Sequence, residues 1–388
     1  MSEAKTYNNV RIWDGIANDY VDATSITIES GRIASLGQSS RTGRDCSGLT
    51  VIPGLIDSHV HMTLDPQIAD VDKQLKQSDD EIRQKMPKRA KEMVHAGITS
   101  ARDLGGGNWL ELELRDQINR GELPGPRLMC AGRPITSIDG HCHFWGGAVK
   151  SVEEGCDIVD QNRMHNVDLI KIMATGGVYT TTTNTGDAQF TKAEFKEMIA
   201  YAHANDYQVA AHCHGAEGIE RVVAAGVDTV EHCSWMNEKG QRGDYRHEVA
   251  LAMARQNTWV SPTVNANWAR FLRINQAHLG MVRHQFREMK SVGVRFIAST
   301  DAGIPHVRHD DLPKALPVFA LYADMSPIEV LKSATSDAAL ALNINHRTGT
   351  ISPGLDADLV FVEGDPLQDL KVLQSPTTVV ARGIEYSR

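Results

Sequence analysis

The sequence lacks long hydrophobic runs and runs of basic residues, and these absences exclude several classes of protein. No apolar stretch among the 388 residues approaches the length of a membrane-spanning helix. The first residues, M-S-E-A-K-T-Y-N-N-V, lack the apolar core of a secretory signal peptide. The formal net charge is −9, whereas a surface that binds nucleic acid is usually basic. We therefore expect no membrane segment and no nucleic-acid partner.

Cysteine is scarce, and its spacing matches no metal ribbon or redox motif. No C-x-x-C pair occurs among the six cysteines, which are Cys46, Cys130, Cys142, Cys156, Cys213 and Cys233. In a chain of this length without a signal peptide, such cysteines are expected to be reduced thiols. The sequence therefore predicts a cytoplasmic protein without structural disulfides.

The chain has the composition of a soluble globular protein and is rich in β-strand patterns at both ends. Hydrophobic residues make up 41% and charged residues 23%. Neither end has enough sequence to form a core alone. We therefore predict one small β-sandwich built from residues 1–50 and 346–388, with a large α/β domain of residues 51–345 inserted between them.

The middle of the chain alternates between apolar strand patterns and helical patterns. The expected strands are 51–58, 97–103, 127–132, 168–173, 207–212, 227–232, 258–262 and 294–300. The expected helices are 80–96, 109–120, 152–165, 191–204, 215–225, 245–256, 267–292 and 326–342. This rhythm fits a (β/α)₈ TIM barrel. A doubly wound sheet is disfavoured because no G-x-G-x-x-G follows the first strand.

Six residues that carry metal or acid–base chemistry close apolar runs in this pattern. They are His59, His61, Lys171, His212, His232 and Asp301. The carboxyl ends of barrel strands are where active sites are built. The convergence of imidazoles, a carboxylate and an amine there predicts a metal-dependent hydrolase.

The H-x-H pair is placed to bind a single ion. Residues two apart on a strand point to the same side, so His59 and His61 can share one metal, and Asp57 lies on the same face. Asp57 is then expected to orient a ligand from behind. H-x-H alone is a weak signal and gains its force from the partners downstream.

Lys171, in D-L-I-K-I-M-A-T-G-G, is the unusual member of the set. A lysine at the end of an apolar strand is costly if it is buried without a partner. One interpretation is a core lysine paired with a carboxylate or reaching the rim. The other is that the amine combines with CO₂ to give a carbamate, an anion with two oxygens that can bridge two metal ions. We favour the carbamate.

His212 and His232 are separated by 20 residues and by an expected helix. Neutral imidazoles at two strand ends suit zinc, although either histidine alone could be an ordinary core residue. His214 shares a face with His212 but lies further into the loop. We expect His214 to support a ligand or to contact substrate.

Asp301, in F-I-A-S-T-D-A-G, ends the last expected strand. A carboxylate there can ligate a metal and take a proton from a metal-activated water. It can equally cap a helix, and the two roles are compatible.

Three loops offer substrate contacts. The segment I-D-G-H-C-H-F-W-G-G carries His141 and His143, A-T-G-G-V-Y-T-T-T-T carries Tyr179, and G-I-P-H-V-R-H-D-D carries Arg308. Histidine and tyrosine can bind a carbonyl oxygen or a carboxylate. A polar loop packed over the barrel mouth is the equally weighted alternative.

The combined motifs resemble the amidohydrolase superfamily over nearly the whole chain. P-G-L-I-D-S-H-V-H is similar to the first-strand signature, and G-T-I-S-P-G-L-D-A-D-L-V-F-V-E-G-D-P-L is similar to the C-terminal β-sandwich signature. The ligand order resembles the binuclear subtype with a carboxylated lysine. This resemblance implies that His59 and His61 hold the α metal, that His212 and His232 hold the β metal, that Lys171 bridges, and that Asp301 is the base.

Within the superfamily, I-K-I-M-A-T-G-G-V and A-A-H-C-H-G most resemble the imidazolonepropionase-like and Xaa-Pro dipeptidase-like branch. In peptidases of that branch, residues near the positions of Tyr179 and His141 contact the substrate. The loop that carries Arg308 often does so too.

The expected activity is hydrolysis of an amide bond in a small N-acyl amino acid, dipeptide, aryl amide or urea by a hydroxide that bridges two divalent metal ions. Zinc suits the imidazoles, but manganese, cobalt or iron could occupy the same ligands. A lactone or ester hydrolase could use the same residues. Lys171 counts against a deaminase, and the open site counts against a non-catalytic barrel with a structural metal. No assembly signal decides between a monomer and a homo-oligomer.

Overall fold

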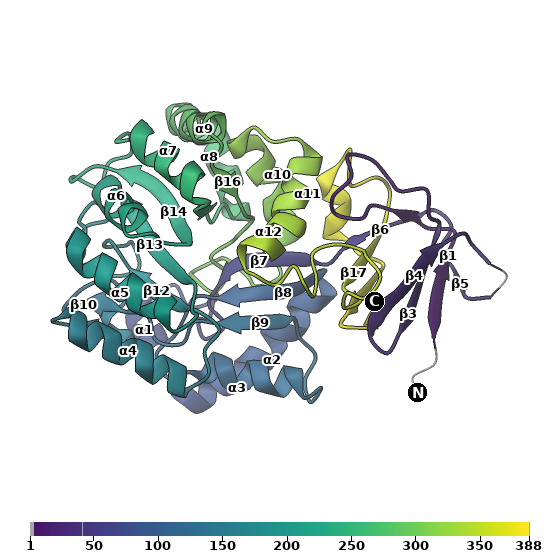
Figure 1. The fold of residues 1–388 in the computed structure, drawn as a ribbon, viewed down its shortest axis with the longest axis horizontal. Helices are drawn as coiled ribbons and strands as arrows, with labels where there is room; N and C mark the ends of the chain where they lie inside the picture. Colours follow the sequence, from purple (N-terminus) through teal and green to yellow (C-terminus); the bar gives the residue numbers. More distant parts are fainter. Residues whose placement is uncertain (1–3, 41, 388) are drawn as a thin grey trace.

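The computed structural model describes residues 4–40 and 42–387 (Figure 1). Strands and helices alternate through the middle of the chain, and further strands from both termini gather at one end of the molecule (Figure 1). None of the helices in these ranges is long and apolar enough to cross a bilayer. The α/β class expected from the sequence is confirmed.

All eight predicted middle strands have counterparts, and every pairing between them is parallel. One sheet contains β7 (Leu55–Val60), β8 (Ile98–Asp103) and β9 (Arg127–Cys130). The other contains β12 (Ile170–Met173), β13 (Val209–Gly215), β14 (Thr229–Met236), β15 (Trp259–Ser261) and β16 (Arg295–Phe296). The neighbours follow the chain order, as short right-handed β–α–β connections require.

Backbone hydrogen bonds join the two sheets at both edges. Asp168 N donates to Cys130 O at 2.8 Å, between the ends of β12 and β9. At the opposite edge, Ser58 N donates to Ala298 O at 3.1 Å and His61 N donates to Ala302 O at 2.7 Å. The strands that carry the predicted ligands therefore surround one central region.

Six predicted helices lie close to their expected positions. They are α2 (Asp79–His95), α3 (Leu110–Asn119), α4 (Val152–Met164), α5 (Lys192–Ala204), α6 (Ala216–Ala224) and α7 (His247–Gln256). Capping boxes start α2 and α5, where Ser78 pairs with Glu81 and Thr191 pairs with Glu194. These capping signals mark the starts of α2 and α5, which is why both helices begin close to their predicted first residues.

Two predicted helices are broken, and two helices were not predicted. The 267–292 helix divides at Asn275, which leaves helical geometry and caps α9 (Gln276–Ser291), so that η2 (Ala266–Arg270) and α8 (Phe271–Ile274) stand apart. The 326–342 helix divides at Thr335 into α11 (Pro327–Ser333) and α12 (Ser336–Ala341). The missed helices are α1 (Val71–Leu75) and α10 (Leu312–Ala323), and two prolines obscure the periodicity of α10.

The predicted strand 51–58 is in fact two strands. β6 (Leu49–Pro53) pairs antiparallel with β17 (Leu359–Glu363), whereas β7 begins at Leu55 and joins the parallel sheet. Gly54 separates them, and a Cβ at Gly54 would lie 2.8 Å from Thr99 Cβ. The change of sheet therefore occurs where the chain passes too close to the Thr99 side chain to carry a side chain of its own.

Of the remaining strands, β10 (Thr136–Ser137) and β11 (Ala148–Val149) pair in parallel as a small separate sheet, and the others form two sheets from the chain ends. One contains β4 (Arg32–Gly37), β3 (Ser25–Glu29), β1 (Lys5–Asn8) and β5 (Arg44–Asp45). The other contains β19 (Ile384–Ser387), β18 (Thr378–Ala381), β17, β6 and β2 (Arg11–Ile12). A separate apolar cluster draws on both sheets, with Tyr7, Ile26, Val51 and Leu359 among its members.

Candidate metal centre and active site

All six predicted ligands line one cavity of about 580 Å³. His59 lies in β7 and His61 directly follows it, while Lys171, His212 and His232 lie in β12, β13 and β14. Asp301 follows the last strand, and its backbone N–H donates to His59 O at 2.9 Å. The structure therefore brings together residues that are up to 242 positions apart in the sequence.

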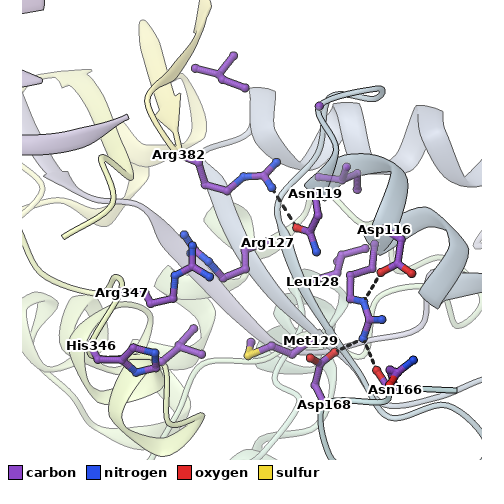
Figure 2. A pocket seen from close by; sticks show the side chains of 15 residues that line it. Asp116, Asn119, Arg127, Leu128, Met129, Asn166, Asp168, His346, Arg347 and Arg382 are labelled. Carbon is purple, nitrogen blue, oxygen red and sulfur yellow. Dashed lines mark hydrogen bonds and ion pairs between the residues drawn. The ribbon is translucent and has the colours of Figure 1, made fainter. Parts of the chain in front are cut away.

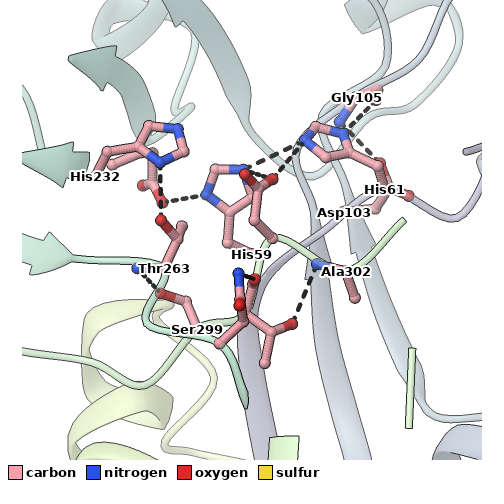
Figure 3. Close-up of polar contacts among 12 residues, drawn as sticks. His59, His61, Asp103, Gly105, His232, Thr263, Ser299 and Ala302 are labelled. Atoms are coloured by element: carbon pink, nitrogen blue, oxygen red, sulfur yellow. Dashed lines mark hydrogen bonds and ion pairs between the residues drawn. The ribbon is translucent and has the colours of Figure 1, made fainter. Parts of the chain in front are cut away.

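The first group of donors is His59, His61 and Asp301. The two Nε2 atoms are 3.3 Å apart, and Asp301 Oδ1 lies 3.3 Å from His59 Nε2 and 3.5 Å from His61 Nε2. Figure 3 shows the rings of His59 and His61 side by side. Two imidazole nitrogens and a carboxylate oxygen at these separations can hold one divalent ion.

Hydrogen bonds at the opposite ring nitrogens fix these two imidazoles. His59 Nδ1 lies 2.9 Å from Glu231 Oε2, and His61 Nδ1 lies 2.8 Å from Gly105 O. Glu231 is fully buried and also accepts from Arg102 Nη2 at 2.8 Å. Acceptors at Nδ1 place the proton there and leave each Nε2 lone pair free for a metal.

The second group of donors is His212, His214 and His232, whose ligand atoms also lie within 4.8 Å of one another. His232 Nδ1 is 2.8 Å from Thr263 Oγ1 (Figure 3), and His214 Nδ1 is 2.9 Å from Ser234 Oγ. The geometry thus brings His214, expected in a supporting or substrate role, into the cluster that could hold an ion.

Lys171 is buried in the wall of the same cavity, with 1% of its surface exposed. Within residues 4–40 and 42–387, no hydrogen bond or ion pair reaches its side chain. Burial lowers the pKa of the Lys171 amine. The paired core lysine considered above is therefore not what the structure shows, and a lowered pKa favours the neutral amine that can react with CO₂.

Both His232 and Asp301 have backbone conformations that non-glycine residues seldom adopt. Their φ angles are +65° and +63°, in the left-handed region where such residues are strained. Strain of this kind gathers at functional sites, where the surrounding structure holds it in place. His232 lies inside β14 and Asp301 lies beyond the end of β16, and both side chains line the cavity.

Electrostatics favour neutral histidines and an ionised aspartate. Burial, with a further contribution from Lys171, lowers the pKa of His59 to about 4. Burial opposes ionisation of Asp301, but the neighbouring His59 and His61 lower the pKa of its carboxyl below the usual range. Behind them, burial raises the pKa of Asp57 to about 7, while Thr300 and His59 donate to its oxygens. Neutral imidazole and carboxylate are the forms that bind metal.

Two of the predicted loop residues reach the cavity and two do not. His141 and Tyr179 line it, and the His141 ring centroid lies 4.4 Å from that of His212. His143 is half-buried, with Nδ1 3.0 Å from Gly140 O, and is not part of the wall. Arg308 pairs with Asp310 and lines a different cavity, although Ile304, Pro305 and Val307 of the same loop line this one.

Several residues of the site were not identified from the sequence. The cavity also has apolar and aromatic walls, which include Leu64, Trp145, Met173, Trp268, Phe271 and Ile304. Met173 ends β12 two positions after Lys171, a spacing that could have identified it. The others come from loops and short helices without a recurring spacing, so no sequence pattern identified them. Glu231 had a weak signal, because it directly precedes His232 in T-V-E-H-C.

Comparisons with known proteins find relatives that cover most of the chain. The chain is 27% identical over 366 residues to ochratoxinase from Aspergillus niger, an alignment covering 85% of this chain and 73% of that protein. The structure of a Xaa-Pro dipeptidase with bound methionine superposes with a TM-score of 0.88 at 27% identity, covering all of both chains. A prolidase complexed with N-methylphosphonate-L-proline superposes with a TM-score of 0.85 at 25% identity, again covering all of both chains.

A family model gives the assignment directly. The model described as "Amidohydrolase family" matches residues 50–384, which include every predicted metal ligand. Members of this family generally use divalent metals, in agreement with the two donor clusters. The chain belongs to the amidohydrolase family.

Proposed function

We propose that this protein is a binuclear metal-dependent amidohydrolase that cleaves the amide bond of a small substrate. Family membership already makes it a hydrolase of carbon–nitrogen bonds. The observation that supports the finer statement is one cavity lined by two donor clusters and a buried lysine without a partner. A single structural ion would need only one such cluster.

The donor set fits two ions, with zinc as the preferred metal. His59, His61 and Asp301 would hold one ion, and His212 and His232 the other, with His214 beside them. Lys171 would bridge as a carbamate: its neutral nitrogen bonds to the carbon of CO₂, and the released proton leaves to solvent. The product is an anion, so the buried amine no longer carries a positive charge in that environment.

When bound, the two ions supply a water of lowered pKa and polarise the substrate carbonyl. Asp301 is ionised and adjacent to His59 and His61. It accepts a proton from the attacking water while the water oxygen bonds to the carbonyl carbon. The same carboxyl then returns the proton to the nitrogen as the C–N bond breaks. Glu231 and Gly105 hold the two imidazoles in the tautomer that this geometry needs.

The walls of the cavity favour a small substrate with an apolar or aromatic group. A volume of about 580 Å³ is within the range of small-molecule sites. Apolar side chains surround the donors, while the His141 imidazole and the Tyr179 hydroxyl are polar groups of the wall that could bind a carboxylate or carbonyl. N-acyl amino acids, dipeptides and aryl amides have these features, and the named relatives include a Xaa-Pro dipeptidase.

We also propose that the eight parallel strands form one closed (β/α)₈ barrel and that the terminal sheets form a β-sandwich. The backbone hydrogen bonds at both sheet edges support closure, and the shared apolar cluster supports the sandwich. Because β6 pairs with β17, the boundary of the sandwich moves from residue 50 to Gly54.

The test is a substrate screen with zinc and bicarbonate present. Wild type should release free amine from N-acyl amino acids, dipeptides or aryl amides. Tyr179→Phe should raise KM several-fold, about what a lost hydrogen bond is worth. Arg308→Gln is the matched control and should behave as wild type, because Arg308 lies outside the cavity. Hydrolysis of esters alone, or deamination, would contradict the proposal.

A further inference from the structure

A second cavity, of about 720 Å³, is shown from close by in Figure 2. It lies at the opposite ends of the strands from the donor clusters. Arg127, the first residue of β9, and Asp168, just before β12, form part of its wall. The loop after α12 contributes His346 and Arg347, and the turn between β18 and β19 contributes Arg382. The cavity thus lies between the parallel sheets and the terminal sheets.

Arginine side chains gather on one side of this cavity, and several of them share the same two carboxylates. Arg127 pairs with Asp358 at 2.9 Å and with Asp356 at 2.8 Å. Arg347 pairs with the same Asp356 at 2.8 Å, and Arg32 approaches it at 3.8 Å. Two carboxylates therefore already serve three guanidinium groups.

Arg382 adds a fourth guanidinium group without adding a carboxylate. Its Nη1 donates to Asn119 Oδ1 at 3.2 Å (Figure 2) and its Nη2 donates to Gly125 O at 3.3 Å. In the described chain no carboxylate lies within ion-pair distance of this group. Burial, followed by the positive charge of Arg127, lowers the pKa of Arg382. The cluster carries excess positive charge in a chain whose net charge is −9.

The protein leaves part of the donor capacity of this cluster unused. The Nε atoms of Arg127 and Arg382 have no hydrogen-bond partner among the described residues. Arg347, whose side chain is 48% exposed, uses Nε and Nη2 for Asp356 and keeps Nη1 free. A guanidinium fork matches the oxygens of a phosphate group. Across the cavity, Arg115 is already neutralised by Asp116 and Asp168.

The wall also has an apolar part, formed by Ile118, Leu128, Met129 and Ile344, beside polar residues that include Asn119, Asn166 and His346. A free inorganic ion would leave this surface in contact with water, whereas an organic group would cover it. Guanidinium groups on one side and an apolar wall beside them match a charged head with a small organic body.

We propose that this cavity binds a small phosphomonoester, with the phosphate at Arg347 and Arg382 and the organic group against Leu128 and Met129. The site is separate from the donor clusters, and the proposal does not depend on the reaction catalysed there. The alternative is that the arginines serve only to join the terminal strands to the parallel sheets through Asp356 and Asp358.

Isothermal titration calorimetry of the metal-loaded protein at constant ionic strength tests the proposal, with glycerol 3-phosphate and inorganic phosphate as probes. Wild type should bind glycerol 3-phosphate saturably and more tightly than phosphate. Arg347→Gln should weaken binding about tenfold, the worth of one charge-assisted hydrogen bond. Arg347→Lys keeps the positive charge but loses the forked guanidinium group, so it should bind with intermediate affinity. It replaces the glutamine variant in the test if that variant is unstable.

Two controls separate this site from others. Arg287→Gln removes an exposed arginine of α9 that pairs with Asp324. This change should leave binding unchanged. Asp301→Asn should also leave it unchanged, whereas loss of binding there would assign the heat to the metal centre and overturn the proposal. No saturable heat up to about 10 mM, unchanged affinity in Arg347→Gln and Arg347→Lys, or equal affinity for both probes would each contradict it.

Discussion

Lys171 shows how one residue can be singled out from the sequence for a physical reason. A buried amine without a partner is unfavourable, so a lysine in an apolar strand had to be paired, to reach the rim, or to be modified. The structure buries it with 1% of its surface exposed, in the cavity that holds both donor clusters. Neither a carboxylate partner nor a place at the rim is seen for it among the described residues, and burial lowers the pKa of the amine, so the carbamate is the option that we propose.

We predict that Lys171→Ala loses amide hydrolysis by orders of magnitude and retains less metal, because the bridging ligand is gone. In ¹³C-labelled bicarbonate, wild type should show a carbamate NMR signal that the variant lacks. Lys192→Ala, at an exposed lysine on α5, is the control and should match wild type. Full activity in Lys171→Ala would disprove the carbamate.

Asp301→Asn should keep most of the metal and lose turnover by roughly 10²–10⁴-fold, the usual contribution of a general base. Asparagine tolerates positive φ as aspartate does, so the backbone at +63° should survive the change. Asp324→Asn, at an exposed aspartate with φ of +54°, is the control for a change of this type. A near-normal kcat in Asp301→Asn would remove this carboxylate from the mechanism.

The sequence did not show which of the candidate loop residues reach the cavity. His141 and His143 are two positions apart in one loop, yet only His141 reaches the cavity. Arg308 lies close to Asp301 in the sequence but faces Glu92 and Asp310 instead. A strand fixes the direction of every second side chain, whereas a loop fixes none. This difference explains why all the predicted ligands line one cavity, whereas only some of the predicted substrate contacts do.

At the scale of elements, alternation of apolar patterns located β7 to β9 and β12 to β16 but did not show where a strand changes sheets. The apolar run continues from Val51 to Ile56 without a polar residue, so hydrophobicity does not mark the division between β6 and β7 at Gly54. Similarly, the helical pattern over 267–292 continues through Asn275, where the helix is interrupted. Periodicity reports burial, whereas the division at Gly54 depends on the neighbouring Thr99 side chain and the interruption at Asn275 on a local helix cap.

We predict that Gly54→Ala destabilises the fold by about 1–3 kcal/mol, the usual cost of overpacking. The new Cβ would overlap the side chain of Thr99 on β8. Gly280→Ala, in α9 where the added methyl meets nothing within 4 Å, should instead stabilise by about 0.5–1 kcal/mol through helix propensity. Urea unfolding of the two variants gives the comparison, and equal stabilities would show that the β6–β7 junction tolerates a side chain.

At the scale of the whole molecule, the sequence predicted the α/β class, the parallel order and the family, because each depends on patterns spread over hundreds of residues. The family match over 50–384 covers both the strands that carry ligands and the returning C-terminal strands. The arginine cavity between these two parts was not predicted, because Arg32, Arg127, Arg347 and Arg382 share no spacing in the sequence. Only the folded chain brings them together.

The central claim is that one chain holds two divalent ions in a single cavity, and metal content tests it most directly. Protein purified without chelator, reconstituted with zinc and bicarbonate and then dialysed, should contain about two ions per chain by elemental analysis. His232→Ala, which removes one donor of the second cluster, should fall to about one. A wild-type value of one or none after reconstitution would contradict the binuclear account.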